Sequence, residues 1–200
     1  MAHVIGILGS PLTEGNTALL LRRALKGAED AGCTVDEIVV TNLDFEACNE
    51  MFFCRDHETC IMDDDMQLMY EKIRTADSII VATPVMTMGI PGKLKSFMDR
   101  FQVFYMAKYL RKTPLVDKER IGWRRGLFIC ISGMAVPEVF AGAKLTASTF
   151  FDIIDCPYSD ELLINDMDRI LDISTRCDLL DAAYEKGFAL GRTLSTDLCP

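Results

Sequence analysis

Short, continuous runs of apolar residues alternate along the chain with longer segments in which apolar residues recur every three or four positions. Continuous runs are typical of strands buried on both faces, and the wider spacing is typical of helices with one buried face. The runs predict strands over residues 3–8, 35–40, 78–82, 127–131 and 162–164. The spacing predicts helices over residues 17–31, from residue 64 onward, and over residues 92–106, 138–154 and 167–194. Residues 41–63 and 109–125 lack either pattern and are expected to be loops.

Strands that alternate with helices imply a parallel sheet with right-handed crossovers. We therefore predict an α/β fold with a doubly wound, five-stranded parallel sheet in the flavodoxin-like order 2-1-3-4-5, with helices on both faces and a single domain over residues 1–200. In that order, a ligand binds outside the carboxyl ends of strands one and three. Three loops should meet there, over residues 9–17, 83–90 and 132–137.

Composition narrows the class of protein. Half of the 200 residues are hydrophobic, which is enough for a sizeable core, and the net charge of −9 argues against general nucleic-acid binding. We expect no membrane span, because no apolar run is long enough, and no signal peptide, because the first strand begins at residue 3. The expected location is the cytoplasm. In that reducing compartment the eight cysteines should be core residues or ligands and not disulfides.

The most informative stretch is Gly9–Thr17, with the sequence GSPLTEGNT between the first strand and the first helix. A strand–loop–helix junction gathers free backbone N–H groups at the positive end of a helix dipole, which favours a bound phosphate. Hydroxyl and amide side chains add neutral donors, namely Ser10, Thr13, Asn16 and Thr17. The alternative is an ordinary turn in which Asn16 caps the helix.

Exclusion indicates which phosphate this loop would hold. A Walker loop requires a lysine directly after its second glycine, where this chain has Asn16, and a dinucleotide-binding fingerprint requires a third glycine that is absent. A phosphatase loop would contain a nucleophilic cysteine and an arginine, and this loop has neither. A loop of hydroxyls and amides without a cation suits a terminal phosphate that is held and never transferred, as in bound FMN.

Three motifs together resemble the NADPH-dependent FMN reductases, and within them the iron–sulfur flavoproteins of anaerobic microbes. These motifs are GSPLTEGNT, TPVMTMGIPGKLKSFMDRF and the ISG turn after the fourth strand, and the resemblance extends over residues 3–190. It implies bound FMN, a flavodoxin-like fold and a homodimer or homotetramer. It assigns the phosphate to Ser10, Leu12, Asn16 and Thr17 and the flavin ring to Pro84, Val85, Met86, Thr87, Gly89, Ser132 and Gly133. Met88 joins the ring loop by its position, and Met86 stands where the family often has an aromatic residue.

A cysteine segment, residues 44–63, is the second informative stretch. Iron–sulfur flavoproteins carry C-x-x-C-x-x-C and a fourth cysteine a few residues later. Cys48, Cys54 and Cys60 match the first, third and fourth positions, whereas Met51 stands at the second. Three interpretations are open: a remnant loop without a cluster, a cluster with three cysteines and an outside ligand such as His57, a carboxylate or water, or a zinc site with His57 as the fourth ligand.

The sequence therefore predicts an FMN-dependent oxidoreductase in which FMN carries the chemistry and the protein binds and orients it. Electrons would come from NAD(P)H or a ferredoxin and pass to a small acceptor such as a quinone or a flavin. Seven basic residues between positions 108 and 125 are candidates to attract a nucleotide phosphate or an acidic ferredoxin, or to form a subunit contact. Alternatives are an electron carrier without turnover, and a nucleotide-binding regulator that has lost flavin.

Overall fold

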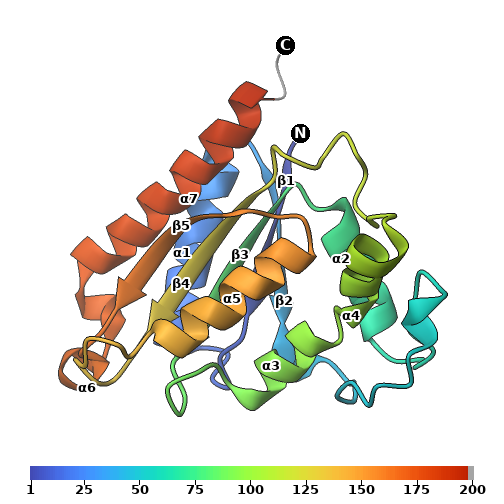
Figure 1. Ribbon diagram of the computed structural model, residues 1–200. Helices are drawn as coiled ribbons and strands as arrows, with labels where there is room; N and C mark the ends of the chain where they lie inside the picture. Colours follow the sequence, from blue (N-terminus) through green and yellow to red (C-terminus); the bar gives the residue numbers. More distant parts are fainter. Residues whose placement is uncertain (198–200) are drawn as a thin grey trace.

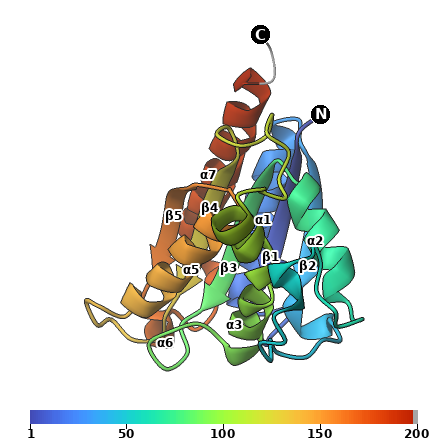
Figure 2. The ribbon, with the colours of Figure 1, turned by 45° about the vertical axis from the view of Figure 1, so that its right-hand side comes forward.

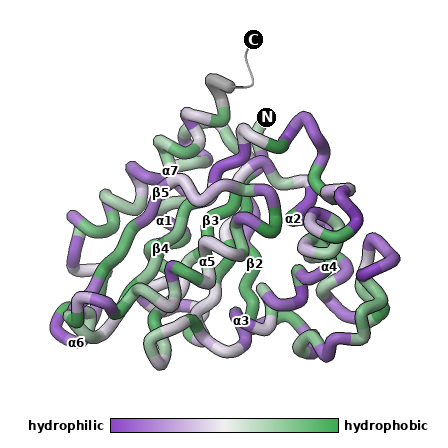
Figure 3. The backbone as a smooth tube through the Cα atoms, in the orientation of Figure 1, coloured by the Kyte–Doolittle hydropathy of each residue, from purple (hydrophilic) through white to green (hydrophobic). Residues whose placement is uncertain are grey.

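The computed structural model describes the backbone of residues 1–197 and the side chains of residues 1–194. Its centre is a five-stranded, fully parallel sheet in the order β2-β1-β3-β4-β5, which confirms the predicted class and strand order. The strands are β1 (His3–Leu8), β2 (Thr34–Val39), β3 (Ser78–Pro84), β4 (Arg125–Ile131) and β5 (Tyr158–Ile164). Figure 3 shows β3 and β4 as hydrophobic segments at the centre of the molecule.

Helices cover both faces of the sheet (Figures 1 and 2). On one face α1 (Asn16–Asp30) and α7 (Cys177–Asp197) pack side by side, and on the other lie α2 (Met66–Thr75), α3 (Gly92–Asp99) and α5 (Ala141–Ile153). Successive strand residues point to opposite faces, so Ile79 and Val81 join the core under α3, whereas Ile80 and Ala82 join the core under α1. Both cores need apolar residues, which explains why the strand sequence is continuously hydrophobic.

The largest differences from the predicted boundaries are at three places. The strand expected over residues 162–164 begins at Tyr158, because β5 is an edge strand whose polar first half is partly exposed. The helix expected over residues 92–106 is interrupted after Asp99, resumes as α4 (Gln102–Tyr105) and continues as a π-helix over Met106–Arg111, where a loop was expected.

The third difference is at the carboxyl end of the sheet. The helix expected over residues 167–194 is divided into α6 (Met167–Ile170), a 3₁₀ turn (Ile173–Thr175) and α7. The interruption centres on Leu171, whose φ of 59° is incompatible with a right-handed helix. The remaining short elements are 3₁₀ turns over Val40–Asn42 and Phe53–Arg55. Within residues 1–197, no helix has the length and apolar character needed to cross a membrane.

Glycines at the crossing of α1 and α7 allow the backbones of the two helices to touch. A Cβ atom added to Gly187 would lie 1.8 Å from the carbonyl oxygen of Ala24, and one added to Gly27 would lie 2.2 Å from the carbonyl oxygen of Tyr184. Neither neighbour is a side-chain end that could move aside. The two helices therefore pack at this distance only because both positions lack a side chain.

We expect Gly187→Ala to lower the free energy of unfolding by about 1–3 kcal/mol, because the helices must separate to admit the methyl group. Urea denaturation followed by circular dichroism measures the change. Gly92→Ala is the matched control, since a Cβ at Gly92 would meet no atom within 4 Å. Equal stability of the two variants would contradict the packing described here.

Candidate functional site

The carboxyl ends of the strands form one edge of the sheet, at the bottom of Figure 1, where the loops after β1, β3 and β4 meet. Each loop is tied to the neighbouring strand by a backbone hydrogen bond. Gly9 N–H donates to the Ala82 carbonyl at 2.8 Å, and Val85 N–H donates to the Ile131 carbonyl at 2.7 Å. Ser132 N–H donates to the Ile164 carbonyl at 2.8 Å. The three predicted loops are therefore held together at the predicted edge.

The first loop, residues 9–17, gathers neutral hydrogen-bond donors at the start of α1 and is called the cradle below. Ser10 is buried, and its hydroxyl accepts the Leu12 N–H at 3.1 Å, which leaves the hydroxyl proton free to be donated. The first intrahelical hydrogen bond of α1 runs from Leu19 N–H to the Gly15 carbonyl, so the N–H groups of the preceding first-turn residues have no partner within the helix. Free amides at the positive end of a 15-residue helix fit a phosphate.

Asn16 does not cap α1, because Gly15 occupies the cap position. Its side-chain amide instead bonds the backbone beyond β5: Nδ2 donates to the Leu171 carbonyl at 2.8 Å, and Oδ1 accepts the Ile173 N–H at 3.0 Å. Among the remaining candidates, Thr17 is buried in the first turn, Thr13 is half-buried, and Leu12 is exposed.

The cation nearest to the cradle in sequence is held by acidic side chains. Arg22, on α1, donates to Glu14 at 2.7 Å and to Glu37 at 3.1 Å, and its Nη2 also donates to the Thr13 carbonyl. These hydrogen bonds raise the pKa of Arg22 and lower that of Glu14. Arg22 therefore ties the loop to α1 and β2, and its guanidinium is occupied by these partners.

The second loop contains a tight two-residue turn. Met86 and Gly89 exchange both backbone hydrogen bonds at 3.0 Å, and the central residues Thr87 and Met88 have φ values of 50° and 60°. Positive φ at both central positions is the type I′ pattern, which is uncommon for residues other than glycine and asparagine and is strained for a β-branched threonine. Within residues 1–197, neither central N–H has a hydrogen-bond partner, so both are available to a ligand.

The backbone of α5 packs against this turn. A Cβ atom added to Gly142 would lie 2.3 Å from the Met88 carbonyl oxygen, so the helix backbone contacts the turn directly. The sequence analysis did not single out Gly142. A glycine in the first turn of a helix was the available signal, but nothing in the sequence indicates which segment it contacts.

The third loop begins at Ser132, which is buried, and Gly133, which is half-buried. Apolar side chains around the three loops stay exposed, although they lie at the edge of a well-packed core. They are Leu12, Met86, Met88, Met134 and Val136. An exposed apolar rim beside the cradle and free backbone donors fits a ligand with a planar apolar part and a phosphate tail.

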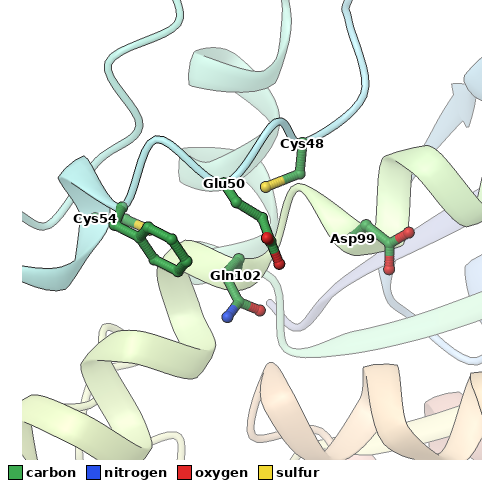
Figure 4. A pocket seen from close by; sticks show the side chains of 6 residues that line it. Cys48, Glu50, Cys54, Asp99 and Gln102 are labelled. Carbon is green, nitrogen blue, oxygen red and sulfur yellow. The ribbon is translucent and has the colours of Figure 1, made fainter.

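The thiols of the cysteine segment lie near one another but are not arranged to hold a single metal ion. Cys48 and Cys54 line a cavity of 340 Å³ with Glu50 and with Gln102 of α4 (Figure 4). Burial raises the pKa of the Cys54 thiol, and the nearby thiols of Cys60 and Cys48 raise it further. Within the part of the chain that the structure describes, no three His, Cys, Asp or Glu side chains are placed to hold one metal ion.

The two remaining candidate ligands, Met51 and His57, are also poorly suited to a cluster or a metal ion. Met51, at the second cysteine position of the motif, is 53% exposed and offers a thioether where a cluster normally has a thiolate. The ring of His57 stacks on that of Phe53 with centroids 3.7 Å apart, and its Nδ1 lies 3.0 Å from the Phe53 carbonyl oxygen. These residues do not fit a four-thiolate cluster, and the zinc set with His57 is not assembled.

Most cations of the basic stretch bond within the chain. Lys108 pairs with Asp155 at 2.9 Å, and Arg120 pairs with Asp77. Arg124 is fully buried and donates to the carbonyls of Ile154 and Ile73 at 2.6 and 2.7 Å. The stretch therefore contributes to the packing of the amino end of the sheet, a role that the sequence interpretations did not include.

The strand order is that of flavodoxin-like proteins, in which ligands bind outside the carboxyl ends of the strands. The chain belongs to the NADPH-dependent FMN reductase family, whose model matches residues 2–135. FMN is the cofactor of this family, and the cradle, the free turn amides and the apolar rim fit it.

Two iron–sulfur flavoproteins are among the proteins that are similar to this chain in sequence. The chain is 35% identical over 119 residues to an iron–sulfur flavoprotein of Methanosarcina thermophila, a match that covers 60% of this chain and 59% of the relative. It is 30% identical over 138 residues to an iron–sulfur flavoprotein of Archaeoglobus fulgidus, covering 69% and 58%. The matches thus span less than two thirds of these relatives.

Solved structures share the fold. An NAD(P)H:quinone oxidoreductase from Methanothermobacter marburgensis aligns with a TM-score of 0.64 and 18% identity over 97% of both chains. An FMN-dependent NADH-azoreductase from Bacillus anthracis, in complex with FMN, aligns with a TM-score of 0.62 and 14% identity over 97% of this chain and 99% of its own.

Proposed function

We propose that the protein is an FMN-dependent oxidoreductase that takes electrons from NAD(P)H or a ferredoxin and passes them to a small acceptor such as a quinone or a flavin. The observation that carries this proposal is the pair of free N–H groups at Thr87 and Met88, on the same sheet edge as the phosphate cradle. Bound FMN would supply the hydride and electron chemistry.

The chain's own residues bind and orient the cofactor in this proposal. Ser10 and the first-turn amides of α1 would hold the phosphate, with Thr13 and Thr17 beside them. Backbone N–H groups of the second loop would face the ring edge and stabilise negative charge there. Pro84, Val85, Met86 and Gly89 would shape this side of the ring site, and Ser132 and Gly133 would close the other side.

An electron carrier without substrate turnover is the second candidate. Within residues 1–197 the two histidines lie away from the three loops, His3 on β1 and His57 in the cysteine segment. The loops therefore offer no imidazole for acid–base catalysis, and a carrier needs none. Steady-state oxidation of NADPH with a quinone separates the candidates, since only the oxidoreductase turns over. In either case we propose a homodimer or homotetramer, which sedimentation velocity would test.

We further propose that the cysteine segment is a remnant that holds no cluster. The support is chemical, because Met51 offers a thioether at the position of the second thiolate, and no three of the described His, Cys, Asp or Glu side chains are placed to hold one metal ion. The cavity beside Cys48 and Cys54 is then an ordinary part of the segment's packing.

An absorption spectrum of anaerobically purified protein, before and after dithionite, tests both proposals. We expect flavin bands that bleach on reduction, with neither iron nor acid-labile sulfide in stoichiometric amount. A broad reducible background with bound iron would contradict the remnant proposal alone. A protein that stays colourless after FMN is added would contradict the proposed function.

A further inference from the structure

Residues 166–173, called here the strap, connect β5 to the 3₁₀ turn before α7 and have an unusual backbone. Asp166 has a φ of 60°, and Leu171 has a φ of 59° and a ψ of −59°. The N–H of Asp172 donates to the Ile170 carbonyl at 2.7 Å, so Leu171 is the centre of a γ-turn with positive φ. This conformation is rare and strained for a residue with a side chain, and it persists only where the surroundings enforce it.

Contacts with the third loop help to hold the strap in this conformation. Met167 N–H donates to the Ser132 carbonyl at 2.9 Å, and Asp168 N–H donates to the Gly133 carbonyl at 3.3 Å. A Cβ atom added to Gly133 would lie 2.4 Å from Oδ1 of Asp168, so the Asp168 side chain lies directly against Gly133. The first half of the strap is therefore fixed to the loop that would border the flavin ring.

The other enforcing contact is with the phosphate cradle. Asn16 uses both ends of its amide on the strap, donating to the Leu171 carbonyl at the centre of the γ-turn and accepting the Ile173 N–H just after it. Only an amide of this length donates and accepts at once in this geometry. A carboxylate would lose the donated bond, and a hydrocarbon would lose both.

We propose that Asn16 is a positioning residue whose side chain, by clamping the strap, holds the phosphate cradle and the third loop at a fixed separation. This inference rests on the proposed flavin site, and it replaces the prediction that the Asn16 side chain binds phosphate. Asn16 lies within the residues that the family model matches, 2–135, whereas the strap lies beyond them. The backbone N–H of Asn16, in the first turn of α1, remains available to the phosphate.

The test compares FMN with riboflavin, which has the ring but no phosphate. Asn16→Ala should weaken both by the same factor, about tenfold, as expected for the loss of two hydrogen bonds. The ratio of the two dissociation constants should stay at the wild-type value. Fluorescence titration with each flavin measures this ratio. Asn165→Ala, which alters an exposed asparagine just before the strap, is the matched control and should change neither affinity.

A second measurement is independent of flavin. Amide hydrogen exchange of the apo protein should show faster exchange over residues 166–175 in Asn16→Ala than in wild type, with α5 unchanged. Loss of FMN affinity with unaltered riboflavin affinity would show that Asn16 binds the phosphate directly and would overturn the proposal, as would unaltered affinity for both flavins. A wild-type protein that binds neither flavin would instead overturn the proposed function, and the positioning role with it.

Discussion

Gly142→Ala should reduce the affinity for FMN by at least about tenfold while leaving the protein folded. The added methyl group would lie 2.3 Å from the Met88 carbonyl oxygen, which is a backbone atom and not the movable end of a side chain. The turn at Thr87–Met88 must therefore move away from α5, and its free N–H groups move with it. The substitution itself favours helix by about 0.5–1 kcal/mol, so thermal stability should not fall in parallel with affinity.

Flavin titration and thermal unfolding of the same variant separate these effects. Gly92→Ala is the control, because it adds the same methyl group to the start of α3 in open space. Wild-type FMN affinity in Gly142→Ala would mean that the turn does not contact the flavin. A matched loss of affinity and stability would mean that the methyl group disrupts the fold and not the site.

The second large effect is expected at Asp64. Its carboxylate accepts two hydrogen bonds from Arg100, at 2.5 and 3.0 Å, and Arg100 also donates to the Glu46 carbonyl at 2.7 Å. The Arg100 side chain is only 1% exposed. Burial alone would lower the pKa of Arg100, but the hydrogen bonds to Asp64 raise it, so the guanidinium stays charged. This pair anchors the cysteine segment to the break between α3 and α4.

Asp64→Ala should lower the free energy of unfolding by about 3–5 kcal/mol, because it leaves a buried guanidinium without its counter-charge. Chemical denaturation measures the loss. Asp99→Ala is the matched control: it removes an acidic partner from the exposed Lys95, and such pairs contribute about 0–1 kcal/mol. Similar losses in the two variants would contradict the structural role of the buried pair.

Hydrophobic patterning was enough to predict the sheet and its order. The run Ile79–Ala82 is apolar at every position because each face of β3 meets a core, and the sequence reveals this without any knowledge of the partners. The three loops at the carboxyl edge follow from strand order alone, which is why residues 9–17, 83–90 and 132–137 were located correctly.

The parts that could not be predicted depend on contacts between distant residues. The partners of Asn16 lie 155 and 157 residues away, so its local context suggested a helix cap or a phosphate ligand. The γ-turn at Leu171 leaves no composition signal, since leucine favours helix and the conformation is imposed by the strap's contacts. The support of the turn by Gly142 is likewise a tertiary contact between loop and helix.

The contact between α1 and α7 has a consequence for protein synthesis. α1 ends at Asp30, but α7, the helix that packs against it, begins only at Cys177. At ribosomal rates of about 5–20 residues per second, the surface of α1 that packs against α7 stays uncovered for on the order of ten seconds. During that interval the growing polypeptide exposes a surface that chaperones recognise, and the Gly27–Gly187 crossing can form only after the last helix has left the ribosome.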